Sequence, residues 1–81
     1  MTNEYGTKIW RSGDSFHRED GPAIEYADGD KQWWINGLLH REDGPAIERV
    51  NGNKAWYYRG QCINCKDNDE FLRLVKLIAF Y

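Results

Sequence analysis

Histidines and carboxylates recur in this chain at a fixed spacing, in a combination that could do chemistry. A nine-residue block, His-Arg-Glu-Asp-Gly-Pro-Ala-Ile-Glu, occurs at residues 17–25 and again, letter for letter, 23 residues later at 40–48. The block supplies two sets of potential ligands or proton carriers: His17, Glu19 and Asp20, and then His40, Glu42 and Asp43. Imidazole and carboxylate groups bind zinc or manganese and also act as general acids and bases. A metal-dependent enzyme is therefore one hypothesis for this chain.

The same block also has a structural interpretation, which we favour. Each copy is a charged turn whose side chains can hydrogen-bond to the backbone and to one another. A repeat protein keeps such a turn because every unit must pass the chain to the next in the same way. The sequence contains neither a phosphate-binding loop nor a Gly-x-Ser-x-Gly nucleophile motif. We therefore predict a non-enzymatic protein with no catalytic residues, no metal site and no cofactor.

Cys62 and Cys65 form a single Cys-x-x-Cys pair. A zinc site needs two more ligands, and the redox form of this motif normally opens a helix within a βαβ unit. Cys62 stands at the repeat position of Phe16 and Leu39, which favours an apolar packing role. Cys65 lies near an expected helix start, where a thiolate would be stabilised, so whether the two thiols react stays open.

The repeat extends beyond the identical block. A Lys-x-Trp pattern recurs at residues 8–10, 31–33 and 54–56, and Gly29 and Gly37 are matched by Gly52 and Gly60. These matches predict three units, at about residues 8–30, 31–53 and 54–66. The third unit departs from the pattern after Gly60, as expected of a terminal unit that has no successor to pack against.

Alternating strand and turn residues predict an antiparallel β-meander of six to eight short strands. Asp28-Gly29, at the end of the first unit, and Asn36-Gly37, in the second, are both expected to form two-residue hairpin turns. The predicted strands are 8–11 and 15–17, then 23–26, 31–35 and 38–40, and finally 45–50, 54–58 and 61–64.

A two-residue turn at Asp28-Gly29 predicts a specific register between neighbouring strands. It places Ile24 opposite Trp33 and Ala23 opposite Trp34; one unit later, Ile47 lies opposite Trp56 and Ala46 opposite Tyr57. One face of the sheet is then expected to collect six apolar residues: Ile24, Trp33, Ile35, Ile47, Trp56 and Tyr58.

The C-terminal segment predicts a helix over residues 68–80. Asp67 is the expected N-cap, with Glu70 three residues later. Apolar residues at 71, 74, 75 and 78 lie on one helical face, and Leu72, Leu77 and Phe80 widen it. We expect this helix to cover one face of the sheet or to form a homodimer contact.

Composition sets limits on size and partners. The 81 residues suit a single domain spanning 1–81, and the net charge of −2 does not favour nucleic acid as a partner. No apolar run reaches membrane-spanning length, and the first residues do not resemble a signal peptide. With only two cysteines, the sequence predicts a cytoplasmic protein with reduced thiols.

Aromatic and charged side chains define the candidate binding residues. Trp34, Tyr57 and Tyr5 fall off the main apolar face, where they form either a second packing layer or an exposed patch for a partner. The predicted binding set combines two of these aromatics with the charged block residues: Trp34, Tyr57, Arg18, Glu19, Asp20, Arg41, Glu42 and Asp43.

The units, with the pattern Trp-x-x-Asn-Gly-x-x-His-Arg-Glu-Asp-Gly-Pro-Ala, resemble a short β-hairpin repeat found in many viral and bacteriophage proteins. They are loosely similar to MORN-type repeats, which also build antiparallel meanders. The resemblance covers residues 8–60, and its distinctive core is at 17–23 and 40–46. It implies a β-meander and a phage or large-virus origin, and it implies no catalytic activity.

Two non-enzymatic hypotheses follow. The first is a small phage-encoded binding protein that inhibits or modulates a host protein, one of antiviral defence included, in the host cytoplasm. The second is a structural protein that self-associates through open sheet edges or the apolar helix. The metal-dependent enzyme is the third and least favoured hypothesis.

Overall fold

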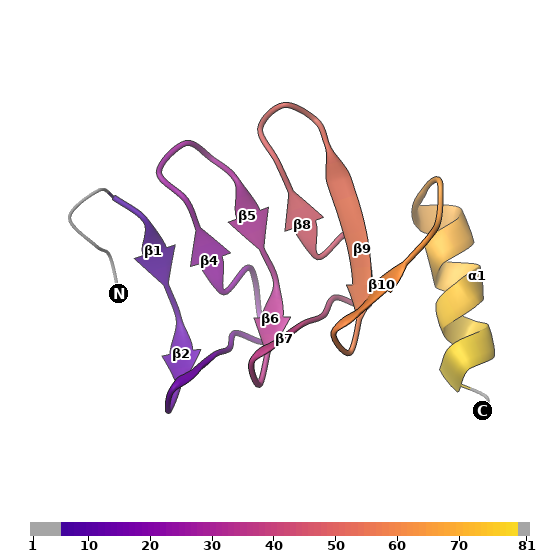
Figure 1. Cartoon of the computed structure of the whole chain (residues 1–81), viewed down its shortest axis with the longest axis horizontal. Coiled ribbons are helices and arrows are strands. Elements are labelled where there is room, and N and C mark those ends of the chain that lie inside the picture. Colours follow the sequence, from indigo (N-terminus) through magenta and orange to yellow (C-terminus); the bar gives the residue numbers. More distant parts are fainter. Residues whose placement is uncertain (1–5, 80–81) are drawn as a thin grey trace.

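The computed structural model describes residues 6–79, which form ten short strands and one helix (Figure 1). The strands are β1 Lys8–Ile9, β2 Arg11–Ser12, β3 Ser15–Phe16, β4 Ile24–Glu25, β5 Lys31–Gln32, β6 Trp34–Ile35, β7 Leu38–Leu39, β8 Ile47–Glu48, β9 Lys54–Tyr58 and β10 Gln61–Ile63. The helix is α1, Asn68–Ala79. The predicted fold class, mainly antiparallel β with one C-terminal helix, is confirmed. No helix within residues 6–79 is long and apolar enough to cross a membrane.

The repeated units stand side by side along one sheet. Its six strands follow the order β1-β4-β5-β8-β9-β10, and every neighbouring pair is antiparallel. The ladders β2-β3 and β6-β7 extend the same units at their lower end, and α1 stands beyond β10 at the end of the row (Figure 1). The molecule is thin, 17 Å along its shortest axis, so few side chains can be enclosed.

Predicted strands 8–11 and 31–35 are each divided at a tryptophan, which raises the number of strands above the six to eight expected. The backbone of Trp33 changes partner at this point. Its N–H donates to the Ala46 carbonyl at 2.8 Å, whereas its own carbonyl accepts from the His40 N–H at 3.0 Å. Trp33 therefore bonds to one neighbouring segment through its N–H and to another through its carbonyl. In the third unit, by contrast, Trp56 lies inside an unbroken strand, β9.

The register predicted from Asp28-Gly29 is wrong by one residue. Ile24 pairs with Gln32 rather than with Trp33. The Tyr26 N–H donates to the Asp30 carbonyl and the Gly29 N–H to the Tyr26 carbonyl, both at 2.9 Å, which closes a three-residue loop. Gly29 has φ 102°, the left-handed residue that a three-residue hairpin of this kind requires. The predicted pairing of Ala23 with Trp34 fails for the same reason.

The next unit repeats this loop and therefore the same error. Ile47 pairs with Ala55 rather than with Trp56, because the loop at residues 50–52 again contains three residues. Continued by one residue, this register places Ala46 opposite Trp56 rather than Tyr57. By contrast, the two-residue turn at Asn36-Gly37 is confirmed: Ile35 pairs with Leu38.

The predicted apolar face is only partly enclosed. Ile24 and Tyr58 are buried, whereas Trp33, Ile35, Ile47 and Trp56 are partly buried. The most fully enclosed apolar residues are Ala23, Ala46 and Phe71, each 0% exposed. A single thin layer explains this, because it encloses small alanines fully, whereas the one large side chain enclosed as fully among the described residues, Phe71, belongs to α1.

The start of α1 confirms the predicted cap. The Glu70 N–H donates to Asp67 Oδ1 at 2.9 Å, and Glu70 Oε1 accepts from the Lys66 N–H at 3.2 Å. Phe71 is enclosed and Leu74 and Val75 are partly buried, but Ile78 is 42% exposed, so the predicted face packs only over its first turns. Residue 80, the predicted helix end, and Tyr5 lie outside the described residues.

Candidate functional site

An arginine lies at the centre of each copy of the repeated block. Arg18 Nε donates to Asp20 Oδ1 at 2.9 Å, and its Nη1 donates to the Pro22 carbonyl at 3.2 Å and to Glu25 Oε2 at 3.1 Å. The guanidinium carbon lies 3.9 Å from the ring centroid of Trp10, a cation–π contact. The hydrogen bond from Arg18, and then its positive charge, lower the pKa of the Asp20 carboxyl.

The second copy reproduces this network. Arg41 Nε donates to Asp43 Oδ1 at 2.8 Å, and its Nη1 reaches the Pro45 carbonyl at 3.0 Å and Glu48 Oε2 at 2.6 Å. Its guanidinium carbon again lies 3.9 Å from a tryptophan centroid, that of Trp33. A Cβ atom on Gly44 would come within 3.0 Å of this carbon, so the glycine leaves the space that the arginine occupies.

The two histidines connect successive units. His17 Nδ1 accepts the N–H of Asn36 at 3.0 Å, and His40 Nδ1 accepts the N–H of Arg59 at 2.8 Å. Each donor lies in the lower hairpin turn of the following unit. A neutral imidazole that accepts at Nδ1 carries its proton on Nε2. These Nε2 atoms lie 3.6 Å from Glu19 and 3.4 Å from Glu42.

The histidines and carboxylates do not assemble a metal-ligand cluster in the part of the chain that the structure describes. No group of three or more His, Cys, Asp or Glu side chains within residues 6–79 could hold a metal ion. Asp20 and Asp43 accept from arginines. The Nδ1 atoms of His17 and His40 accept from backbone amides, so these ring nitrogens serve the fold.

A groove of about 740 Å³ opens between the two copies of the block. Its charged lining consists of Arg18, Glu19, Asp20, Arg41, Glu42 and Asp43, all six of the charged residues in the predicted binding set. The remaining lining consists of Gly21, Pro22, Trp33, Ile35 and His40. The groove therefore combines an aromatic and aliphatic strip with carboxylates from both copies.

Trp34 and Tyr57, the other two predicted binding residues, do not line this groove. Trp34 packs edge-to-face against Phe16, with ring centroids 5.3 Å apart, and its Nε1 donates to Gln32 Oε1 at 2.9 Å. Tyr57 pairs with Cys62 across β9 and β10, and its carbonyl accepts the N–H of Arg41 at 3.2 Å. Both are partly buried and join neighbouring units or strands.

Trp33 and Ile35 are groove residues that the sequence reasoning assigned to the core face. The signal that could have found Trp33 is its constant offset from the arginine: Trp10 precedes Arg18 by the same number of residues as Trp33 precedes Arg41. A planar cation and an indole at a repeated spacing suggest stacking. That contact brings the tryptophan to the block.

The cysteines differ from the predictions made for them. Cys62 is exposed, although it occupies the position of Phe16, because β10 has no following hairpin to supply the aromatic partner that Phe16 finds in Trp34. Burial, and then the negative charges of nearby acidic residues, raise the pKa of the Cys65 thiol. Burial and these charges thus favour the protonated thiol of Cys65, which is opposite to the effect expected from the helix start.

Comparisons of the chain with protein-family models, with curated proteins and with solved structures found no match. The resemblance to viral and bacteriophage hairpin repeats thus stays a prediction drawn from the motif itself.

Proposed function

We propose that this protein is a small, non-enzymatic protein-binding module, with the groove between the two copies of the block as its docking surface. The observation that carries the proposal is the groove itself, an open hollow of about 740 Å³ lined by Trp33, Ile35 and exposed carboxylates. Apolar surface at the centre with polar groups around it is the usual composition of a protein-binding site.

The contacts within the groove walls support this proposal. Arg18 and Arg41 each tie their own loop together through three hydrogen bonds and a stacked tryptophan. His17 and His40 connect these loops to the next hairpin. A surface that is ordered before binding loses less conformational entropy when the partner arrives, which favours affinity.

The resemblance to viral and bacteriophage repeats supports a more specific proposal. The chain is then a phage-encoded protein of the host cytoplasm that inhibits or modulates a host protein, one of antiviral defence included. The groove supports the binding role in this proposal, and the resemblance of the motif supports the phage origin and the host partner.

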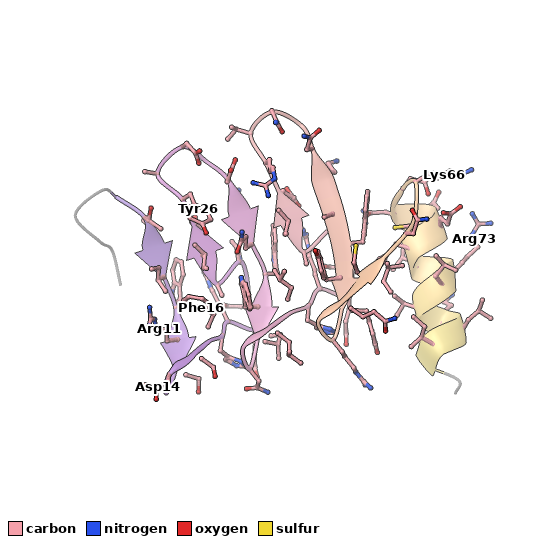
Figure 2. All side chains as sticks on the ribbon, viewed as in Figure 1. Arg11, Asp14, Phe16, Tyr26, Lys66 and Arg73 are labelled. Atoms are coloured by element: carbon pink, nitrogen blue, oxygen red, sulfur yellow. The ribbon has the colours of Figure 1, made fainter. Side chains whose placement is uncertain are left out.

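Affinity capture from host lysate tests the docking surface if it is run with a matched pair of variants. Glu19→Trp places a bulky side chain in the groove at a position that is 83% exposed and needs no repacking. Asp14→Trp makes the same change at the tip of the hairpin below β2 (Figure 2). We expect a host protein that the wild type and Asp14→Trp capture and Glu19→Trp loses. An empty capture, or equal capture by both variants, would overturn the proposal.

Self-association is the second candidate function, because α1 exposes apolar side chains. Leu72, Leu77 and Ile78 are 40%, 60% and 42% exposed. A second copy packed on this helix would cover them. Light scattering of the wild type should then report a dimer or larger assembly that Leu77→Ser converts to a monomer, whereas a monomeric wild type would remove this candidate.

A further inference from the structure

Within the nine-residue block, one position contributes little to the fold. The histidine connects units, the arginine stacks on tryptophan, and the aspartate, the proline carbonyl and the last glutamate accept from that arginine. The glycine leaves space for the guanidinium, and the alanine and isoleucine are buried in the first copy. The glutamate that follows the arginine, Glu19 or Glu42, is the exception.

Glu19 and Glu42 are largely exposed and weakly held. Their carboxylates lie 3.6 Å and 3.4 Å from a histidine Nε2, and their side chains are 83% and 74% exposed. Such a contact is an ion pair only if the histidine is protonated, and exposed pairs of this kind contribute little to stability. Both glutamates line the groove, at equivalent positions in the two copies.

The charge of the groove favours a cationic ligand. Its lining holds four carboxylates, those of Glu19, Asp20, Glu42 and Asp43, against two guanidinium groups. Asp20 and Asp43 already accept from those guanidinium groups, which leaves the two glutamates to attract a further positive charge. Trp33 and Ile35 add apolar surface on which a hydrocarbon chain can lie.

The protein itself contains an example of the contact that such a groove can make. Arg41 places its guanidinium 3.9 Å from the ring centroid of Trp33 while two carboxylates accept its N–H groups. The planar guanidinium pairs with carboxylates and stacks on aromatic rings, whereas the compact lysine ammonium does neither as well. An aromatic ring with adjacent carboxylates is therefore suited to arginine.

We propose that the groove binds an arginine side chain from an extended basic segment of a partner protein. The guanidinium pairs with the carboxylates of Glu19 and Glu42, and the methylene groups lie along Trp33 and Ile35. This inference rests on the proposed function, because it names the chemistry of the partner that the groove recognises.

An NMR titration with a synthetic (Gly-Arg)4 peptide tests this inference on the intact protein. We expect saturable shifts concentrated at residues 19–22, 33–35 and 40–43, and binding several-fold tighter than that of (Gly-Lys)4, since the planar guanidinium presents several N–H donors to two carboxylates, which the compact ammonium does less well. The double variant Glu19→Gln/Glu42→Gln should bind (Gly-Arg)4 about tenfold more weakly, because two exposed ion pairs are lost. Both substitutions keep the size of the side chain.

The matched control is Asp14→Asn/Asp69→Asn, which changes the net charge equally outside the groove. It should bind (Gly-Arg)4 within about twofold of the wild type, because general electrostatic attraction is weak and screened by salt. No saturable binding, equal affinity for arginine and lysine peptides, or equal loss in both double variants would overturn the inference. If Glu19→Trp still abolishes capture of the host protein in that case, the proposed function stands and only the arginine assignment fails.

Discussion

Trp33 and Trp56 occupy the same position in successive units, but the chain closes around them in different ways. Trp33 lies under the guanidinium of Arg41, which is held by Asp43 and Glu48. Trp56 instead donates from Nε1 to Asn68 Oδ1 of α1, at 2.7 Å. In the inner unit, charged groups cover the tryptophan, whereas in the terminal unit a helix contacts it.

The repeat alignment shows how the end was changed. One unit after Arg41 and Glu48, the chain has Asn64 and Phe71, so both members of the ion pair are replaced. Phe71 is 0% exposed and is the largest fully buried side chain among the described residues. A terminal unit has no successor to cover it, and a helix with an enclosed aromatic residue supplies that cover. We call Arg41 with Asp43 and Glu48 the ionic closure, which lies beside the open groove, and Phe71 with α1 the apolar closure.

The apolar closure should contribute most to stability. We expect Phe71→Ala to lower the free energy of unfolding by about 3–5 kcal/mol, because it removes a fully enclosed aromatic side chain and leaves a cavity. Urea denaturation checks this value. Leu77→Ala, on the exposed side of the same helix, should change the free energy by less than about 0.5 kcal/mol. A smaller loss for Phe71→Ala than for any arginine variant would contradict the comparison.

The ionic closure should contribute less, and equally in its two copies. Arg41→Met keeps an unbranched apolar chain on Trp33 but leaves Asp43 and Glu48 without their donor. We expect a loss of about 1–2 kcal/mol in the free energy of unfolding. Arg18→Met should cost the same within about 0.5 kcal/mol, since its contacts match, and urea denaturation of both variants measures the difference. Clearly unequal losses would show that the two copies, although alike in geometry, do not contribute equally to the free energy of unfolding.

The histidine link should have a smaller effect. His40→Phe removes the acceptor of the Arg59 N–H, at a cost of about 1 kcal/mol in unfolding free energy. Hydrogen exchange checks this locally, because the amide of Arg59 should exchange faster while the amides of β4 are unchanged. His40→Asn, whose side-chain oxygen can accept, should restore part of the protection. Unchanged exchange at Arg59 in His40→Phe would refute the proposed link between units.

The smallest expected effect concerns the thiols near the helix start. Because the pKa of Cys65 is raised, less of it is thiolate near neutral pH, and it should be alkylated more slowly than the exposed Cys62. Iodoacetamide labelling of Cys62→Ser and Cys65→Ser measures each thiol separately. Glu70→Gln should speed the reaction of Cys65, since it removes a nearby negative charge that raises the pKa. Faster labelling of Cys65 than of Cys62 in the wild type would contradict this assignment.

Local signals predicted local structure well. The Asn36-Gly37 turn formed as expected, with φ of 50° and 81°, and Asp67 caps the helix. Asp28-Gly29 carries an equally strong turn signal, but its glycine is the last residue of a three-residue loop rather than the second of two. The dipeptide alone does not distinguish these geometries, because both need a left-handed residue, and the one-residue difference moved every pairing predicted from it.

The candidate site was predicted in part. The six charged residues were chosen because they repeat, and all six line the groove. Trp34 and Tyr57 were chosen because aromatic residues are frequent in interfaces, and they are instead placed where neighbouring units or strands meet. Aromatic content indicates that buried area is available, but it does not say which ring faces a neighbouring strand and which faces a groove.

The sequence by itself determined the repeat, the antiparallel meander and the capped terminal helix, because these depend on residue identity and short spacing. Only the tertiary structure decided that Trp33 divides its strand, that Arg41 stacks on it, and that the two blocks face one groove. These features depend on which unit packs against which, and on side chains 8 or more positions apart meeting in space. Stacking holds each arginine on the tryptophan of its own unit, and the space left between the two blocks is set by packing rather than by any local pattern.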